Sequence, residues 1–247
     1  MGRLLILRHG QSTWNASGRW QGWTDTPLSE AGEAQAVRAG RALAGMGTVP
    51  DIVACSDLAR ARRTAQLLAG QLGYGGELMV DTGLREQDLG QWTGLTRDEI
   101  EARWPGELAA RSAGALVPVP GGEPGAAFFA RAVAAVRQVA ALGADLAVVV
   151  THGGVLISIE QALGLAVPHW RHTNLSGWWL EAAPVAGDGH GPGDGHGPGS
   201  GGAGAGVVLR GLTPVDLLAP EGLLAPGAGA RDAPSRRAGA QGVTGRA

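Results

Sequence analysis

The sequence has no lysine, a single cysteine and no long apolar run. All 20 residues in the Lys+Arg count are arginines, and the formal net charge of −2 gives no sign of nucleic acid or an anionic membrane as a partner. Cys55 cannot form an internal disulfide, which suits a small core residue in a reducing compartment. A membrane-spanning helix needs an apolar stretch of about 18 residues or more, and none occurs. Because no leader-like segment precedes the first apolar run, we expect a cytoplasmic protein.

Glycine and proline, by contrast, are abundant, with 43 and 14 residues, and much of the excess lies after residue 184. A Gly-Asp-Gly-His-Gly-Pro repeat around His190 and His196 lies in this stretch, which is too poor in apolar residues to offset the entropy of ordering it. We predict one domain over residues 1–218 with a disordered Gly/Pro-rich insert at about 184–206, and a disordered C-terminal tail over 219–247. The two histidines could bind a metal ion, but two histidines in a Gly-Pro repeat are weak evidence for a metal site.

Three short apolar runs predict buried strands of a mainly parallel sheet. They span residues 3–7, 51–55 and 146–151, and each is followed by an amphipathic or Ala-rich stretch that predicts a helix. The expected fold class is α/β, a three-layer α/β/α sandwich. Further elements predicted are helices over about 29–45, 58–73, 96–104, 123–142 and 155–163, a strand at 78–80, a hairpin of 177–182 with 207–210, and an irregular cap over 107–120.

Cationic side chains follow these strands where each strand ends. Arg8 and His9 follow the first, Arg60 comes soon after the second, and His152 follows the third. Ligands of open α/β sheets bind beyond the carboxyl ends of the strands, so these side chains are expected to converge. Guanidinium groups bind phosphoryl oxygens bidentately, and the pattern therefore indicates a pocket for a phosphorylated metabolite. Taken alone, an Arg-His pair at a strand end could equally be a buried ion pair or a core histidine.

Five ordered blocks resemble the histidine phosphatase superfamily, in the branch that contains the cofactor-dependent phosphoglycerate mutases. The blocks cover roughly residues 3 to 182. They are Arg8-His9-Gly10-Gln11-Ser12 with Asn15, then Gly18 to Ser29, Ser56 to Ala65, Leu84-Arg85-Glu86 with Gly90 and Trp92, and Gly121-Gly122-Glu123 with His152-Gly153-Gly154. The resemblance implies a phosphoglycerate mutase-like fold and catalysis through a phosphohistidine, with no metal and no cofactor.

The resemblance also implies the catalytic roles. His9 would be the nucleophile, Arg8, Arg60 and His152 the phosphate clamp, and Glu86 the general acid and base. Two of these assignments have structural alternatives, since Arg60 could belong to a surface charge cluster with its neighbouring arginines, and Glu86 could pair with Arg85 and leave Asp88 as its substitute.

Side chains of the first loop are candidates for substrate binding. Ser12, Asn15 and Gln21 can hydrogen-bond a phosphate or its ester, and Arg8, Arg60, Glu86, His152 and Gly153 complete the expected substrate-binding set. Capping of the loop is an almost equally good explanation for Ser12, Asn15 and Gln21. Tryptophans of the loop are expected to pack and form walls.

The favoured function is hydrolysis of small phosphomonoesters, of the sugar phosphate or phosphoglycerate type. The alternative is a phosphoglycerate mutase, but the cap over 107–120 holds a single cation, Arg111, whereas the mutases have a longer, more basic cap. A catalytically silent phospholigand-binding protein is a third possibility, yet no catalytic group is missing. Sugar-linked phosphoglycerates are one candidate substrate, and a homodimer stays open.

Overall fold

A computed structural model describes residues 2–112, 118–165, 172–184 and 207–218. The predicted insert, including His190 and His196, and the predicted tail lie largely outside these residues, and their predicted disorder stays a prediction. Within the part of the chain that is described, no helix is long and apolar enough to cross a membrane.

Six strands form one sheet in the order β3-β2-β4-β1-β5-β6. The strands are β1 (Gly2–Arg8), β2 (Ile52–Cys55), β3 (Met79–Val80), β4 (Leu146–Thr151), β5 (Ser176–Pro184) and β6 (Val207–Asp216). The first four are mutually parallel, whereas β5 runs antiparallel to β1 and pairs with β6 as the predicted hairpin. β6 is longer than expected, because pairing continues past a register shift at Leu180/Glu181, next to which Gly211 adopts a positive φ of 61°.

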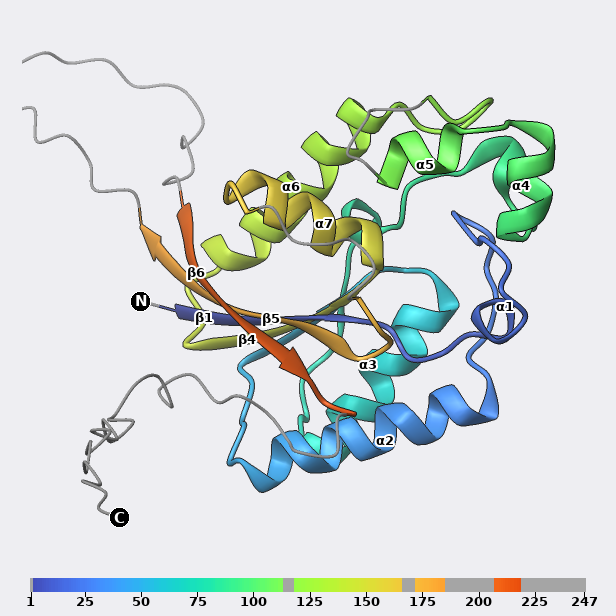
Figure 1. The fold of residues 1–247 in the computed structure, drawn as a ribbon. Coiled ribbons are helices and arrows are strands. Elements are labelled where there is room, and N and C mark those ends of the chain that lie inside the picture. The colour runs from blue at the N-terminus through green and yellow to red at the C-terminus, as the bar shows by residue number, and fades with distance from the viewer. Residues whose placement is uncertain (1, 113–117, 166–171, 185–206, 219–247) are drawn as a thin grey trace, which may run out of the picture.

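Helices cover both faces of the sheet, which confirms the three-layer sandwich (Figure 1). One face carries α2 (Glu30–Gly45) and α3 (Ala59–Leu72), and the other carries α6 (Gly125–Ala141) and α7 (Gly153–Ala162). Successive residues of β1 alternate between the two cores: Leu5 packs with the α2/α3 layer and Ile6 with the α6/α7 layer. A strand that is apolar on both faces is therefore buried on both faces.

Ser29, Pro124 and Cys55 lie at the ends of three of these elements. Ser29 caps α2 by accepting a hydrogen bond from the Gly32 N–H. Pro124 is the residue immediately before α6. Cys55 is fully buried, and burial raises the pKa of its thiol to about 11, so it is an inert core residue.

The segment predicted as an irregular cap contains a helix, and that prediction was wrong. After α4 (Arg97–Arg103), the chain turns through Gly106 and forms α5 (Glu107–Ser112). Residues of good helix propensity, Leu-Ala-Ala-Arg, follow the turn, and Leu108 is buried in a small cluster with Trp92 and Ile100. Tertiary packing thus stabilises a helix too short to form alone. Remaining short elements are α1 (Thr13–Ala16) and two 3-10 turns, η1 (Thr82–Leu84) and η2 (Gly90–Trp92).

Candidate active site

A cavity of about 370 Å³ lies beyond the carboxyl ends of β1 and β4. Its walls include the predicted site residues Arg8, His9, Asn15, Gln21, Arg60, Glu86 and Gly153. Parallel pairing of β1 with β4, with Arg8 opposite Thr151, places His9 and His152 side by side, and their ring centroids are 5.1 Å apart. The convergence expected from the strand ends is therefore present in the structure.

The His9 ring is fixed by a hydrogen bond to its own loop. Its Nδ1 lies 2.7 Å from the carbonyl oxygen of Gly10, which can only accept, so Nδ1 carries the proton. The other ring nitrogen, Nε2, carries no proton, and its lone pair accepts a hydrogen bond from Nε of Arg60 at 3.3 Å. Burial, Arg60 and Arg8 lower the pKa of His9 well below 6.5, so the imidazole is neutral at neutral pH. A buried, neutral imidazole in one tautomer is suited to nucleophilic attack.

Three cationic or potentially cationic side chains, Arg8, Arg60 and His152, surround His9. Arg60 is 1% exposed and donates to the carbonyl oxygens of Thr24 and Gly22 at 2.9 and 2.8 Å, so the alternative of a surface charge cluster is excluded. Burial lowers the pKa of Arg60 to about 10, which leaves it charged at neutral pH. His152 is fully buried, and neither of its ring nitrogens has a hydrogen-bond partner among the described residues. Burial, followed by Arg60 and His9, lowers its pKa well below 6.5.

Glu86 is held at the cavity by backbone groups. Its Oε1 accepts from the Gln87 N–H at 2.9 Å, and its Oε2 accepts from the Gly154 N–H at 3.1 Å, at the start of α7. A β-carbon at position 154 would lie 2.1 Å from Glu86 Oε1, so this close approach requires glycine.

Neither structural alternative for Glu86 is observed. Arg85 forms a bidentate pair with Asp57 instead, and Asp88 closes a local turn by accepting from the Gly90 N–H.

Ser12 caps a helix, which was the structural alternative to substrate binding. It is fully buried and caps α1, where it accepts from the Asn15 N–H, and its hydroxyl donates to Oε1 of Gln21 at 2.7 Å. Asn15 and Gln21 do line the cavity. Because two hydroxyls, from Ser12 and Thr26, donate to the Gln21 oxygen, its amide nitrogen is left available to a ligand.

Two arginines at the site were not assigned roles from the sequence. Arg111, on α5, lines the cavity and donates from Nη2 to Oε1 of Gln87 at 2.5 Å. Arg131, on α6, forms an ion pair with Glu123 and donates to the carbonyl oxygens of Gly83 and Glu86. These contacts fix the loop that carries Glu86. Only the tertiary fold brings these residues to the site, and no local pattern marks them.

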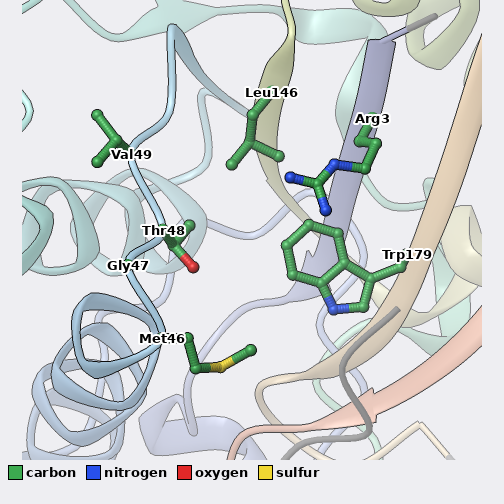
Figure 2. Close-up of a pocket in the computed structure, with 7 residues that line it drawn as sticks. All are labelled: Arg3, Met46, Gly47, Thr48, Val49, Leu146 and Trp179. Atoms are coloured by element: carbon green, nitrogen blue, oxygen red, sulfur yellow. The ribbon is translucent and has the colours of Figure 1, made fainter. Parts of the chain in front are cut away.

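A second hollow, of about 260 Å³, lies away from these residues, at the amino-terminal ends of β1 and β4 (Figure 2). Arg3 lies against the Trp179 indole, with its guanidinium carbon 5.6 Å from the ring centroid, opposite Met46 and Thr48. Among the described residues that line this second hollow, Arg3 is the one cation, and no nucleophilic group lies close to a base. The larger cavity is therefore the candidate for chemistry.

Comparison with known proteins agrees with this geometry. Residues 4–182 match the histidine phosphatase superfamily (branch 1). A glucosyl-3-phosphoglycerate phosphatase of Mycobacterium tuberculosis is 38% identical over 196 residues, which cover 72% of this chain and 86% of the relative. A 2,3-bisphosphoglycerate-dependent phosphoglycerate mutase of Methylorubrum extorquens is 41% identical, but over 126 residues that cover 50% of this chain and 59% of the mutase. The solved structure of a mycobacterial glucosyl-3-phosphoglycerate phosphatase with VO3 superposes with a TM-score of 0.63 at 37% identity, covering 74% of this chain and 94% of that one.

Proposed function

Because this chain belongs to branch 1 of the histidine phosphatase superfamily and is a phosphomonoesterase, we propose that His9 carries its phosphohistidine and that its substrate is a sugar-linked phosphoglycerate. The observation that supports His9 most directly is its hydrogen bond from Nδ1 to the Gly10 carbonyl oxygen. That bond leaves Nε2 without a proton, so this nitrogen has the lone pair that can attack, once Arg60 donates to the phosphoryl group in its place.

In the first step, the Nε2 lone pair attacks phosphorus as the ester P–O bond breaks. The leaving oxygen takes a proton from Glu86, which lies on the cavity wall. Arg8 and Arg60 neutralise the charge on the transferring oxygens, and His152, with two unpartnered ring nitrogens beside His9, is the remaining candidate to bind them.

In the second step, Glu86, now a carboxylate, takes a proton from a water molecule. The resulting hydroxide attacks the phosphorus of the phosphohistidine, the N–P bond breaks, and inorganic phosphate leaves. His9 returns to the neutral form that burial and the two arginines favour, so the cycle closes without any added proton donor.

Arg111 supports a substrate with a second anionic group. It lines the cavity, and the described residues give it no carboxylate partner, only the neutral amide of Gln87. Burial lowers the pKa of Arg111 and Glu86 partly opposes this, which is the situation of a cation that lacks a counter-ion. When Glu86 holds the proton for the leaving group, three guanidiniums, Arg8, Arg60 and Arg111, face a phosphoryl dianion. The glycerate carboxylate would balance the third.

A phosphoglycerate mutase is the second candidate, because stretches of this chain are about 41% identical to such enzymes. Incubation with 3-phosphoglycerate and with glucosyl-3-phosphoglycerate separates the two, with free phosphate and the 2-phospho isomer measured in parallel. We expect phosphate from both and isomer from neither. Isomer formed faster than phosphate would favour the mutase.

The substrate class is tested by Arg111→Gln. Loss of one charge-assisted contact should lower kcat/KM for carboxylate-bearing esters about tenfold or more. The value for p-nitrophenyl phosphate, which has no carboxylate, should change much less. Equal losses on both substrates would contradict a carboxylate partner for Arg111.

A further inference from the structure

A buried carboxylate, that of Glu160, contacts His172, which lines the cavity. Glu160, on α7, is 1% exposed, and its Oε1 accepts a hydrogen bond from Trp178 Nε1 at 2.7 Å. The same oxygen is 2.9 Å from Nε2 of His172, and Oε2 has no hydrogen-bond partner among the described residues. The His172 ring nitrogen is therefore in close polar contact with the Glu160 carboxylate. A carboxylate this buried needs polar partners, and the described residues supply two, the His172 ring and the Trp178 indole N–H.

His172 connects this pair to the active site through its backbone. Its carbonyl oxygen accepts a hydrogen bond from Nη1 of Arg8 at 2.5 Å, and His172 lines the cavity beside Arg8. Arg8 Nε has no partner in the described part of the chain. Arg60 is different, because two carbonyl oxygens and His9 hold it in place. The orientation of Arg8 therefore depends on where one carbonyl group lies.

We propose that Glu160 is a positioning residue for phosphate binding: by holding the His172 ring in the core, it fixes the carbonyl group that orients Arg8. Trp178, on β5, completes the enclosure, since its indole packs edge-on against the His172 ring with centroids 6.5 Å apart. Glu160 itself does not line the cavity. Its effect on phosphate must therefore pass through His172 and Arg8. The inference rests on the proposed role of Arg8.

The first test is Glu160→Gln, which keeps the side-chain volume and an acceptor for Trp178 but removes the charge. Inorganic phosphate is the probe, as a competitive inhibitor of p-nitrophenyl phosphate hydrolysis. Its inhibition constant should rise about tenfold, the scale of one weakened charge-assisted contact. KM should rise by a similar factor and kcat change less, because His9 and Glu86 stay in place.

Trp178→Phe is the matched control. It removes the hydrogen bond that Trp178 donates to Glu160 and perturbs the same core, but it leaves the contact of Glu160 with His172. We expect its inhibition constant for phosphate to stay within about twofold of wild type, a difference too small to reflect a lost charge-assisted contact. Equal weakening in both variants would mean that Glu160 only stabilises the core, and would overturn the proposal.

A double-mutant cycle with Arg8→Lys isolates the coupling. Lysine lacks the planar fork that the His172 carbonyl orients, so Glu160→Gln should add little in that background. Additive losses would overturn the inference. If Arg8→Lys alone leaves phosphate inhibition unchanged, the proposed role of Arg8 is wrong, which is a separate failure.

A further variant guards against misfolding of the single substitution. The pair of substitutions Glu160→Leu and His172→Phe replaces both buried polar side chains by apolar ones, an exchange that proteins often tolerate. We expect this protein to fold, as judged by its thermal midpoint, and to show the same weakened inhibition by phosphate. Wild-type inhibition in the folded double variant would contradict the proposal.

Discussion

Gly154→Ala should disable Glu86 without touching it chemically. The added methyl group would lie 2.1 Å from Glu86 Oε1 and 3.0 Å from the Phe128 ring, whereas real β-carbons keep at least 3.0 Å from their neighbours. The Glu86 carboxylate must therefore retreat by about 1 Å, and a misplacement of that size can cost about 100-fold in rate. A 100-fold loss corresponds to about 2.7 kcal/mol of transition-state stabilisation.

The choice of substrate distinguishes loss of the acid from general damage. The parameter kcat/KM reports formation of the phosphoenzyme, the step in which we propose that Glu86 protonates the leaving oxygen. A poor leaving group, such as the alkoxide of a phosphoglycerate ester, needs that proton, whereas p-nitrophenolate hardly does. We therefore expect the 100-fold fall in kcat/KM for the alkyl ester and a much smaller one for p-nitrophenyl phosphate.

Gly153→Ala provides the comparison at the neighbouring residue of the same helix. Its added methyl group would meet Arg8 Cδ and Nε at 3.9 Å, an ordinary van der Waals distance. Its kcat/KM should therefore fall by no more than a few-fold, since no catalytic atom has to move. The reasoning is refuted if Gly154→Ala keeps more than half of its activity on the alkyl ester, or if both substrates lose equally while the thermal midpoint is unchanged.

Two further predictions concern His9. His9→Ala should abolish turnover and acid-labile phosphate labelling while circular dichroism stays unchanged, and substantial residual activity would move the nucleophile elsewhere. In NMR titrations the His9 ring should remain neutral as the pH falls through 6.5, because burial, Arg60 and Arg8 hold its pKa well below that value. Arg60→Gln removes one of these cations, so the His9 midpoint should move to higher pH; a midpoint at or above 6.5 in the wild type would be inconsistent with the structure.

The strand ends were predictable because their signal is local. An apolar run followed by Arg8 and His9 indicates a buried parallel strand with polar groups at its end, and the topology then has few ways to arrange such strands. His152 could be placed by the same reasoning. Glu86 was assigned by resemblance, because nothing in its own segment shows that Gly154 and Arg131 hold it at the cavity.

The cap and the back of the site could not be predicted, for a different reason. The helix α5 lies between Gly106 and glycine-containing sequence, and burial of Leu108 in a distant cluster stabilises it. From the sequence, Arg111 could therefore be noted only as the single cation of the cap, and its place at the cavity could not be predicted. The contact of Glu160 with His172 and of His172 with Arg8 likewise depends on β1 and α7 being adjacent, over a sequence separation of 164 residues in the case of Arg8.

The pairing of β1 with β4 also sets how the enzyme can fail. The His9 N–H donates to the Thr151 carbonyl oxygen at 2.9 Å, so the backbone of one histidine is joined to the residue before the other. If one of the two strands slipped by one residue, the rings would shift by about 3.3 Å relative to each other. The side chains of the slipped strand would also turn to the opposite face of the sheet. No intermediate register exists between these two. Substitutions along the two strands should therefore leave the reaction geometry intact until pairing is lost, and activity should then disappear together with the fold rather than decline in proportion to stability.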